Sequence, residues 1–317
     1  MIEKFVTAFK RLRRDYSFGG APHKPILLLS ILDGVRINEI RDNRIFITPE
    51  LICCFREYWT MLVNSPHKMN FSLPFFHLRS EPFWKLVTKP GLEIAMTKSN
   101  SVKSLTALNA ALKYATIDPS LFALMLDPIA NDILKQVIIN RYFPGSGNVK
   151  PSYSGLEIMQ AELFMDDSIE YRNKINAIQS NLPEEQVEEE FFVRGALFKR
   201  EIPKLYNYSC AATKIKVVSN TDVQMVDACH IVPFSISKDD TVRNGISLSP
   251  TIHRAFDRGI ITISDDFKIK VSNRIITDDS PYSIKRLDGV EVDLPANVDY
   301  HPLLENLQWH RKEVWLT

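Results

Sequence analysis

The 317-residue sequence has only four cysteines, and none of them forms a CxxC pair. Cys53 and Cys54 are adjacent, whereas Cys210 and Cys229 stand alone. Structural zinc sites use closely spaced ligand pairs, and small disulfide-stabilised domains are rich in cysteine. This spacing excludes both arrangements, so we expect four reduced, packed thiols and no structural zinc.

Long apolar runs are also missing. The longest one, Pro25–Leu32, is far shorter than the roughly 20 residues that a transmembrane helix needs. The first twenty residues lack a basic stretch followed by an apolar stretch, which excludes a typical secretion signal. We therefore expect a soluble cytoplasmic protein that has no membrane partner.

A strong net charge is absent, because the total is only +1. Its distribution is uneven, however. Residues 1–150 hold 20 basic and 12 acidic residues, a net +8, whereas residues 151–190 hold 2 basic and 10 acidic ones, a net −8. An acidic connector thus masks a basic N-terminal region, and basic regions of this kind favour nucleic acid as a partner.

Hydrophobic periodicity divides the chain into three parts: a mainly helical region 1–144, a linker 145–190 that contains a helix, and a region 191–317 of different character. The acidic run Pro183–Glu190 is interpreted as a solvated surface or flexible hinge. The aromatic, proline-interrupted stretch Phe71–Trp84 predicts short strands and turns. Helices are predicted at residues 3–14, from Pro25 onward, and at 49–62, 102–114, 119–141 and 156–178.

Beyond residue 191 the pattern predicts a strand, a loop, a second strand and a short helix. The first strand ends in Asp227-Ala228-Cys229-His230, the second begins at Asn244-Gly245, and the helix carries His253 and Asp257. Hydrolysis of a phosphodiester needs a base for water and a divalent cation for the phosphate charge. A histidine suits the first task, and an imidazole or carboxylate on a rigid helix suits the second.

This segment resembles the HNH (ββα-metal) endonucleases, in the branch with an Ala-x-His-Ile core, an Asn-Gly-x-x-Leu turn and a His-x-x-Phe-Asp-x-Gly helix. The resemblance covers roughly residue 193 to the C-terminus. It implies that His230 is the general base, that Asn244 holds the loop or is a weak ligand, and that His253 binds a divalent metal, Mg²⁺ or Mn²⁺.

The sequence departs from that family at Cys229, where many members place a metal-binding Asp or His. A thiolate is a soft ligand and suits Mg²⁺ poorly. Two carboxylates could complete the coordination. Asp257 lies one helical turn after His253, and Asp227 shares a strand face with Cys229. We prefer Asp257 slightly, and an ordinary helix-end pairing with Arg258 stays open.

The N-terminal region resembles, more loosely and over about residues 5–144, the sulfur-binding domain of type IV restriction endonucleases that recognise phosphorothioated DNA. The resemblance rests on Gly20–Pro25, Leu73–Leu78 and Arg141–Pro144. It implies a basic edge and an apolar cup that accepts sulfur. The candidate residues are His23 and Lys24 at the edge, Leu73, Pro74, Phe75 and His77 at the cup, and Lys98 or Lys103 as a further cation.

Together these features predict an α+β protein in which a mainly helical DNA-recognition domain is joined by an acidic helical linker to an HNH nuclease domain. The expected partner is double-stranded, modified DNA. Two alternatives stay open: an HNH nuclease that reads another mark or none, and a DNA-binding sensor with an impaired nuclease. Because one HNH site cuts one strand, a homodimer is also considered, with Leu156–Ile178 as the contact helix.

Overall fold

The computed structural model describes residues 2–92, 104–147, 149–219, 223–276 and 280–316. It forms two units by internal contacts, one of residues 1–158 with 181–193 and one of residues 159–180 with 194–317. The predicted linker is therefore divided between both units. None of the helices in the described ranges is both long and apolar enough to cross a membrane.

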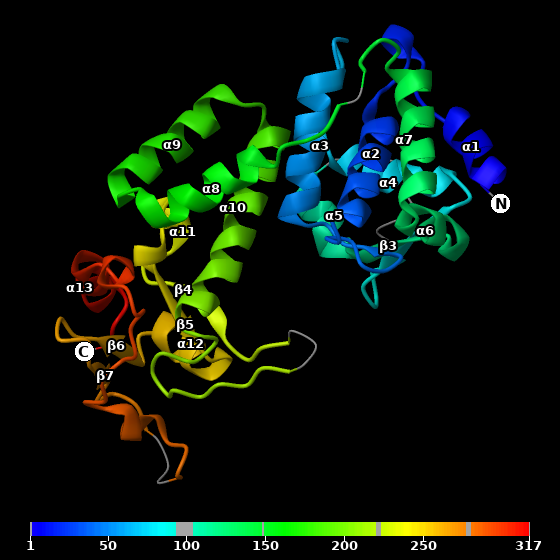
Figure 1. The fold of residues 1–317 in the computed structure, drawn as a ribbon. Coiled ribbons are helices and arrows are strands. Elements are labelled where there is room, and N and C mark those ends of the chain that lie inside the picture. Colours follow the sequence, from blue (N-terminus) through cyan, green and yellow to red (C-terminus); the bar gives the residue numbers. More distant parts are fainter. Residues whose placement is uncertain (1, 93–103, 148, 220–222, 277–279, 317) are drawn as a thin grey trace. The chain divides into compact units, whose positions relative to one another are not determined.

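The first unit is mainly helical (Figure 1). Its helices are α1 (Ile2–Lys10), α2 (His23–Arg36), α3 (Pro49–Leu62), α4 (Ser72–His77), α5 (Leu105–Ala111), α6 (Pro119–Leu126), α7 (Pro128–Tyr142) and the first part of α8 (Ser154–Met165). A small antiparallel sheet has the order β1-β3-β2, from β1 (Arg44–Ile45), β2 (Trp84–Thr88) and β3 (Leu112–Ile117).

Helix α2 is the centre of this unit. Its residues from Lys24 to Val35 are all buried, which explains why the run Ile26–Leu32 is apolar around the whole helix except at Ser30, whose hydroxyl donates to the Ile26 carbonyl at 2.9 Å. A charged cluster lies within this core. Lys135 of α7 is 1% exposed and donates to both carboxylate oxygens of Asp33 at 3.1 Å. Tyr58 and Arg36 also bind Asp33.

One strand prediction and three helix predictions need correction. Phe71–Trp84 is not strand and turn throughout, because α4 and a 3-10 turn (Leu78–Ser80) precede β2. The amide of Leu73 donates to the Asn70 side chain at 3.0 Å, and this contact supports the first turn. The helix predicted over 102–114 ends at Ala111, where β3 begins. Those predicted over 119–141 and 156–178 are each two helices, α6 with α7 and α8 with α9 (Ser168–Asn181).

The acidic run 183–190 is ordered, contrary to the hinge interpretation. It opens α10 (Glu184–Leu205), and its side chains satisfy groups of the first unit. Glu189 is 1% exposed and accepts the Phe71 amide at 2.7 Å. Glu188 accepts the first amides of α5, from Leu105 and Thr106, at 2.9 Å. Negative charge at a helix N-terminus is favourable, so these glutamates have structural partners.

The second unit contains the end of α8, α9, the C-terminal half of α10, two β-hairpins and three further α-helices (Figure 1). Strands β4 (Asp227–His230) and β5 (Gly245–Leu248) form an antiparallel hairpin in which Asp227 faces Leu248 and His230 faces Gly245. Helix α11 (Phe234–Ser237) lies in the loop between them, and α12 (Pro250–Asp257) follows β5. A second hairpin, β6 (Ile261–Ile263) with β7 (Ile269–Val271), and α13 (Leu304–Glu313) complete the unit.

A buried histidine joins α13 to α12. The ring of His310 is 2% exposed and stacks on Phe256 with centroids 3.7 Å apart. One ring nitrogen donates to the Phe256 carbonyl at 3.0 Å and the other lies 2.8 Å from the Thr262 hydroxyl. Burial lowers the pKa of His310 to about 4, so the ring is neutral at pH 7.

This histidine predicts that the second unit loses stability in mild acid. The unfolded chain binds a proton near pH 6.5, whereas the folded chain resists it down to about pH 4. The stabilisation is therefore fully present above pH 6.5 and is lost as pH falls toward 4, by up to roughly 3 kcal/mol. Urea unfolding at pH 7 and 4.5 measures this loss. The His310→Gln variant should show a smaller difference between the two pH values, and an equal difference would refute the assignment.

Candidate active site

The β4–β5 hairpin and α12 carry the residues predicted from the HNH resemblance. Helix α12 begins at Pro250, whose fixed φ suits a first helical position. It ends before Gly259, which has a φ of +66°. A Cβ at Gly259 would lie 2.0 Å from the carbonyl oxygen of Val314, so only glycine fits there. The short helix is thus fixed at both ends, and His253 and Asp257 occupy one face of it.

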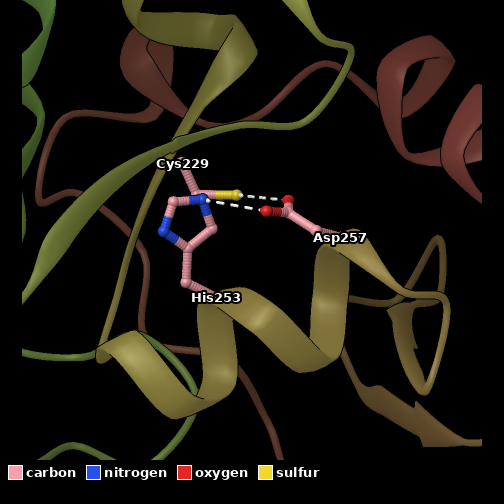
Figure 2. A group of neighbouring side chains, drawn as sticks. All are labelled: Cys229, His253 and Asp257. Atoms are coloured by element: carbon pink, nitrogen blue, oxygen red, sulfur yellow. Dashed lines mark hydrogen bonds and ion pairs between the residues drawn. The ribbon is translucent and has the colours of Figure 1, made fainter.

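Three side chains with metal-binding atoms meet between β4 and α12 (Figure 2). The thiol of Cys229, an imidazole nitrogen of His253 and a carboxylate oxygen of Asp257 all lie within 4.8 Å of one another. The Cys229 sulfur is 3.8 Å from Asp257 Oδ1, and His253 Nε2 is 3.5 Å from Asp257 Oδ2. Cys229 is fully buried, and burial together with the nearby Asp257 charge raises the pKa of its thiol.

Asp227 takes a different position from the one expected of a ligand. Its Oδ2 lies 3.3 Å from Nδ1 of His253, the ring nitrogen opposite the one that faces Asp257. A carboxylate on the far nitrogen of a ligating histidine orients the ring and increases its basicity. The geometry therefore suits Asp227 as a support for His253, while Asp257 is the carboxylate that joins the ligand group.

This group fits a divalent cation. It offers one thiol, one imidazole and one carboxylate, the number of protein ligands found in catalytic metal sites that keep an open position. Within the described ranges, neither Asp227 nor Asp257 has an ion pair with a lysine or arginine. In that part of the chain His253 is the basic side chain that pairs with both carboxylates, and a pair of acids around one imidazole favours binding of a cation.

His230 lies at the end of β4 and is held on two sides. Its ring stacks on Phe198 of α10, with centroids 3.8 Å apart and planes at 5°. Its Nε2 lies 2.7 Å from a carboxylate oxygen of Asp240, a residue only 2% exposed. Because a carboxylate accepts, Nε2 carries the proton and Nδ1 keeps its lone pair. The remaining ring nitrogen can therefore accept a proton.

Gly245 allows this stacking. A Cβ at that position would lie 2.3 Å from Cδ1 of Ile202 and 2.9 Å from the Phe198 ring. The absence of a side chain lets α10 approach β5 closely, and Phe198 then reaches His230, the partner of Gly245 in the hairpin. The backbone of Gly245 is extended, with φ at −120°, so this glycine is required by packing rather than by its conformation.

Asn244 holds the loop after β4. It is fully buried, its Oδ1 accepts the Val232 amide at 2.9 Å, and its Nδ2 donates to the carbonyls of Val232 at 2.8 Å and Asp239 at 2.9 Å. These contacts use both amide protons and one lone pair of Oδ1, which favours the loop-holding role over that of a ligand. They also fix the segment that delivers Asp240 to His230.

Sequence reasoning missed Asp240. The pair Asp239-Asp240 is visible in the sequence, yet only the fold shows that Asp240 reaches His230 while Asp239 accepts the Thr241 amide at 2.8 Å. The left-handed conformation of Lys238, with φ at 54°, ends α11 just before the two aspartates. The sequence signal is the aspartate pair nine and ten residues after the histidine, in the loop between the two predicted strands.

Asp240 yields a test of the His230 geometry. In the Asp240→Asn variant the amide can donate to Nε2, which favours the wrong tautomer, and we expect the cleavage rate to fall by about tenfold to a hundredfold. The affinity for DNA and the unfolding midpoint should stay close to wild type. A rate equal to wild type, or a loss that follows unfolding, would contradict a positioning role.

The N-terminal candidates gather, in part, around a cavity of about 730 Å³. Five predicted residues line it: His23, Lys24, Leu73, Pro74 and His77. The other lining residues are Arg13, Arg14, Asp15, Tyr16, Ala21, His67 and Ser80. Phe75 does not line the cavity, because it is fully buried and packs edge-on against Trp84. Lys98 and Lys103 lie outside the described residues.

The charges around this cavity are distributed unevenly. Lys24 donates to Glu81 and Ser80 at 2.7 Å, so its charge is paired, and burial lowers its pKa. Burial also lowers the pKa of His23 and His77. Arg14 donates to the Gly20 and Ala21 carbonyls and stacks on Tyr142. The positive charge at the rim therefore comes mainly from Arg13 and Arg14, which sequence reasoning did not select.

Comparison with known proteins agrees with this geometry in the C-terminal unit. No curated protein matches the chain. A solved structure described as "Modification dependent TagI restriction endonuclease" is similar at 20% identity, over 38% of this chain and 38% of that one, with a TM-score of 0.28. The likeness thus spans well under half of either protein. A family model described as HNH endonuclease matches residues 210–264, the segment that contains β4, β5 and α12, and this segment is an HNH endonuclease domain.

Proposed function

We propose that this protein is a modification-dependent DNA endonuclease that binds phosphorothioated DNA through its first unit and hydrolyses phosphodiester bonds at the HNH site. The observation that carries the catalytic part is the pairing of His230 with Asp240, next in sequence to a Cys229–His253–Asp257 ligand group. A positioned imidazole and a cation site are the two components that metal-assisted hydrolysis requires.

In this proposal His230 accepts the proton of the attacking water at Nδ1. Asp240 keeps the ring in the required tautomer and stabilises the imidazolium that forms. Phe198 restricts ring rotation by stacking on one face. The base and the ligand Cys229 are adjacent residues, with Cα atoms about 3.8 Å apart, so both can serve a single phosphodiester even though their side chains leave the strand on opposite faces.

Cys229, His253 and Asp257 would hold the divalent cation, and Asp227 would orient His253. When bound, the cation supplies positive charge that stabilises the developing charge on the phosphate and the leaving oxygen. Because one such site cuts one strand, a double-strand break requires two copies of the chain, and we propose that a homodimer forms on DNA.

The cavity of the first unit is proposed to hold the modified phosphate. Its apolar wall includes Leu73 and Pro74, and its rim carries Arg13 and Arg14. Sulfur is larger and more weakly hydrated than oxygen, so an apolar wall can receive it at little cost, whereas an oxygen there would lose hydrogen bonds to water. The arginines would balance the remaining charge of the diester.

Gel shifts with matched duplexes test the recognition part. Wild type should bind a duplex with one phosphorothioate at least about tenfold more tightly than the ordinary duplex, which corresponds to about 1.4 kcal/mol. The Leu73→Ser variant, which makes the wall polar, should lose most of that preference. Leu126→Ser, an exposed leucine outside the cavity lining, is the matched control and should keep it.

Equal affinity of wild type for both duplexes would remove the sulfur proposal and leave an HNH nuclease that reads another mark or none. A preference that survives Leu73→Ser would separate sulfur recognition from this cavity. Binding without any cleavage under all metal conditions would favour a sensor with an impaired nuclease.

A further inference from the structure

The ligand group between β4 and α12 contains a thiol in place of a further carboxylate or imidazole (Figure 2). Cys229 projects its sulfur toward α12, where it lies 3.8 Å from Asp257 Oδ1. Asp227 leaves the same strand face two residues earlier, but its carboxylate contacts His253 Nδ1. The cysteine is therefore the strand residue that joins the group.

The other cysteines show that this placement is particular to Cys229. All four are buried and reduced. Cys53 and Cys54 are buried residues of α3 in the first unit. Within the described ranges, Cys229 is the only cysteine that belongs to a cluster of three potential metal ligands. A cysteine with only a packing role would gain little stability from a neighbouring carboxylate, because S–H is a weak hydrogen-bond donor. The surroundings of Cys229 are those of a ligand.

Ligand softness indicates which cation such a group selects. Thiolates prefer Zn²⁺ and other soft or borderline ions, whereas Mg²⁺ requires hard oxygen ligands in near-octahedral geometry. Here sulfur and nitrogen supply two of the three ligands, and Asp257 supplies oxygen. The set of one thiolate, one imidazole and one carboxylate with an open position matches catalytic zinc-type sites rather than magnesium sites.

We propose that Cys229 is a metal ligand and that the HNH site therefore takes a thiophilic divalent transition metal, of the Co²⁺ and Zn²⁺ class, in preference to Mg²⁺. This inference rests on the proposed nuclease function, because it names the cation of that site. On binding, the sulfur–metal bond forms as the thiol proton leaves to solvent, and no oxidant or reductant takes part.

The support from Asp227 strengthens the same inference. Its carboxylate meets the His253 nitrogen that points away from Asp257, an arrangement that typically contributes a tenfold to hundredfold gain in metal affinity. The site thus has a preferred ring orientation before the cation arrives. Mg²⁺ keeps several of its bound waters, so its affinity would gain little from this preset orientation of the His253 ring.

Cobalt titration of the full chain without DNA tests the proposal. Wild type should bind one Co²⁺ and develop the near-ultraviolet absorption of sulfur-to-cobalt charge transfer. Cys229→Ser should lose that absorption, and Cys53→Ala, another buried cysteine, should keep it. Millimolar Mg²⁺ should not displace the cobalt. His253→Ala should weaken cobalt binding at least about tenfold, as measured by calorimetry.

A second variant covers the case in which Cys229→Ser fails to fold, as judged by circular dichroism. Cys229→Asp supplies a hard ligand and should raise Mg²⁺ affinity at least about tenfold while abolishing the charge-transfer absorption. Absence of that absorption in folded wild type, or its persistence in either Cys229 variant, would overturn the proposal. Displacement of cobalt by Mg²⁺ would do the same.

These measurements distinguish a failure of the metal assignment from a failure of the proposed nuclease function. Charge-transfer absorption without DNA cleavage under any metal would leave the metal assignment in place and refute the nuclease. Cleavage with Mg²⁺ that is equal in wild type and Cys229→Ser, with no charge-transfer absorption, would leave the nuclease in place and refute the metal assignment.

Discussion

Replacement of His230 by alanine is expected to reduce the rate of plasmid cleavage by about a hundredfold to ten-thousandfold, the usual contribution of a general base. The reason is the loss of the proton acceptor that Asp240 and Phe198 hold in place. DNA affinity should change little, because His230 is not among the residues of the N-terminal cavity. Single-turnover nicking of supercoiled plasmid measures the effect.

His301→Gln is the matched control, since this histidine belongs to the same unit, bonds to the Pro295 carbonyl at 2.9 Å and packs edge-on against Phe267, away from the ligand group. Its cleavage rate should stay within about twofold of wild type, as expected for a substitution outside the chemistry. If wild type and His230→Ala gave the same background nicking, the chain would not be an enzyme of this kind.

The second large effect concerns stability. Asp33→Leu should destabilise the first unit by about 3–5 kcal/mol, because it leaves the ammonium of Lys135 buried without a counter-charge. Tyr58 would lose its acceptor as well. Urea unfolding monitored by circular dichroism measures the change, and fluorescence in a Trp309→Phe/Trp315→Phe background, where only Trp59 and Trp84 remain, reports on this unit.

The double variant Asp33→Leu/Lys135→Met removes both charges and should recover most of the lost stability, since a well-packed apolar pair can replace a buried ion pair. Asp42→Leu breaks an exposed pair with Arg44 and should cost at most about 1 kcal/mol. A small effect for Asp33→Leu, or no recovery in the double variant, would show that the buried charge is not the cause.

The elements of the nuclease site could be predicted because their residues carry local information. Asn244-Gly245 and the helix with His253 and Asp257 have spacings that fix a strand, a loop and a helix. What spacing cannot convey is which side chains meet. The approach of Cys229 to Asp257, and of Asp240 to His230, depends on how α12 and the loop pack on the hairpin.

Local patterns misled where tertiary partners decide the structure. The aromatic stretch at 71–84 suggested strands, but burial of Phe71, Phe75 and Phe76 on one side favours helix α4. The acidic run suggested a hinge, because nothing in the sequence reveals that Glu189 meets the Phe71 amide. In each case a contact between distant residues overrides composition.

The residues that line the cavity of the first unit were predicted only in part. Five of the candidate residues line one cavity, because they lie at the start of α2 and along α4, two helices that pack together. Phe75 was selected with them, yet on a helix its position turns it into the core. Arg13 and Arg14 fall within the helix predicted over residues 3–14, although α1 ends at Lys10.

Cleavage of phosphorothioated and unmodified copies of the same plasmid by wild type and His230→Ala, with Mn²⁺ and with Co²⁺, tests both halves of the proposed function in one assay. Wild type should cut the modified plasmid at least about tenfold faster than the unmodified one, and His230→Ala should cut neither above background. Equal cleavage of both plasmids by wild type would contradict modification dependence, and cleavage that survives loss of His230 would contradict the active site.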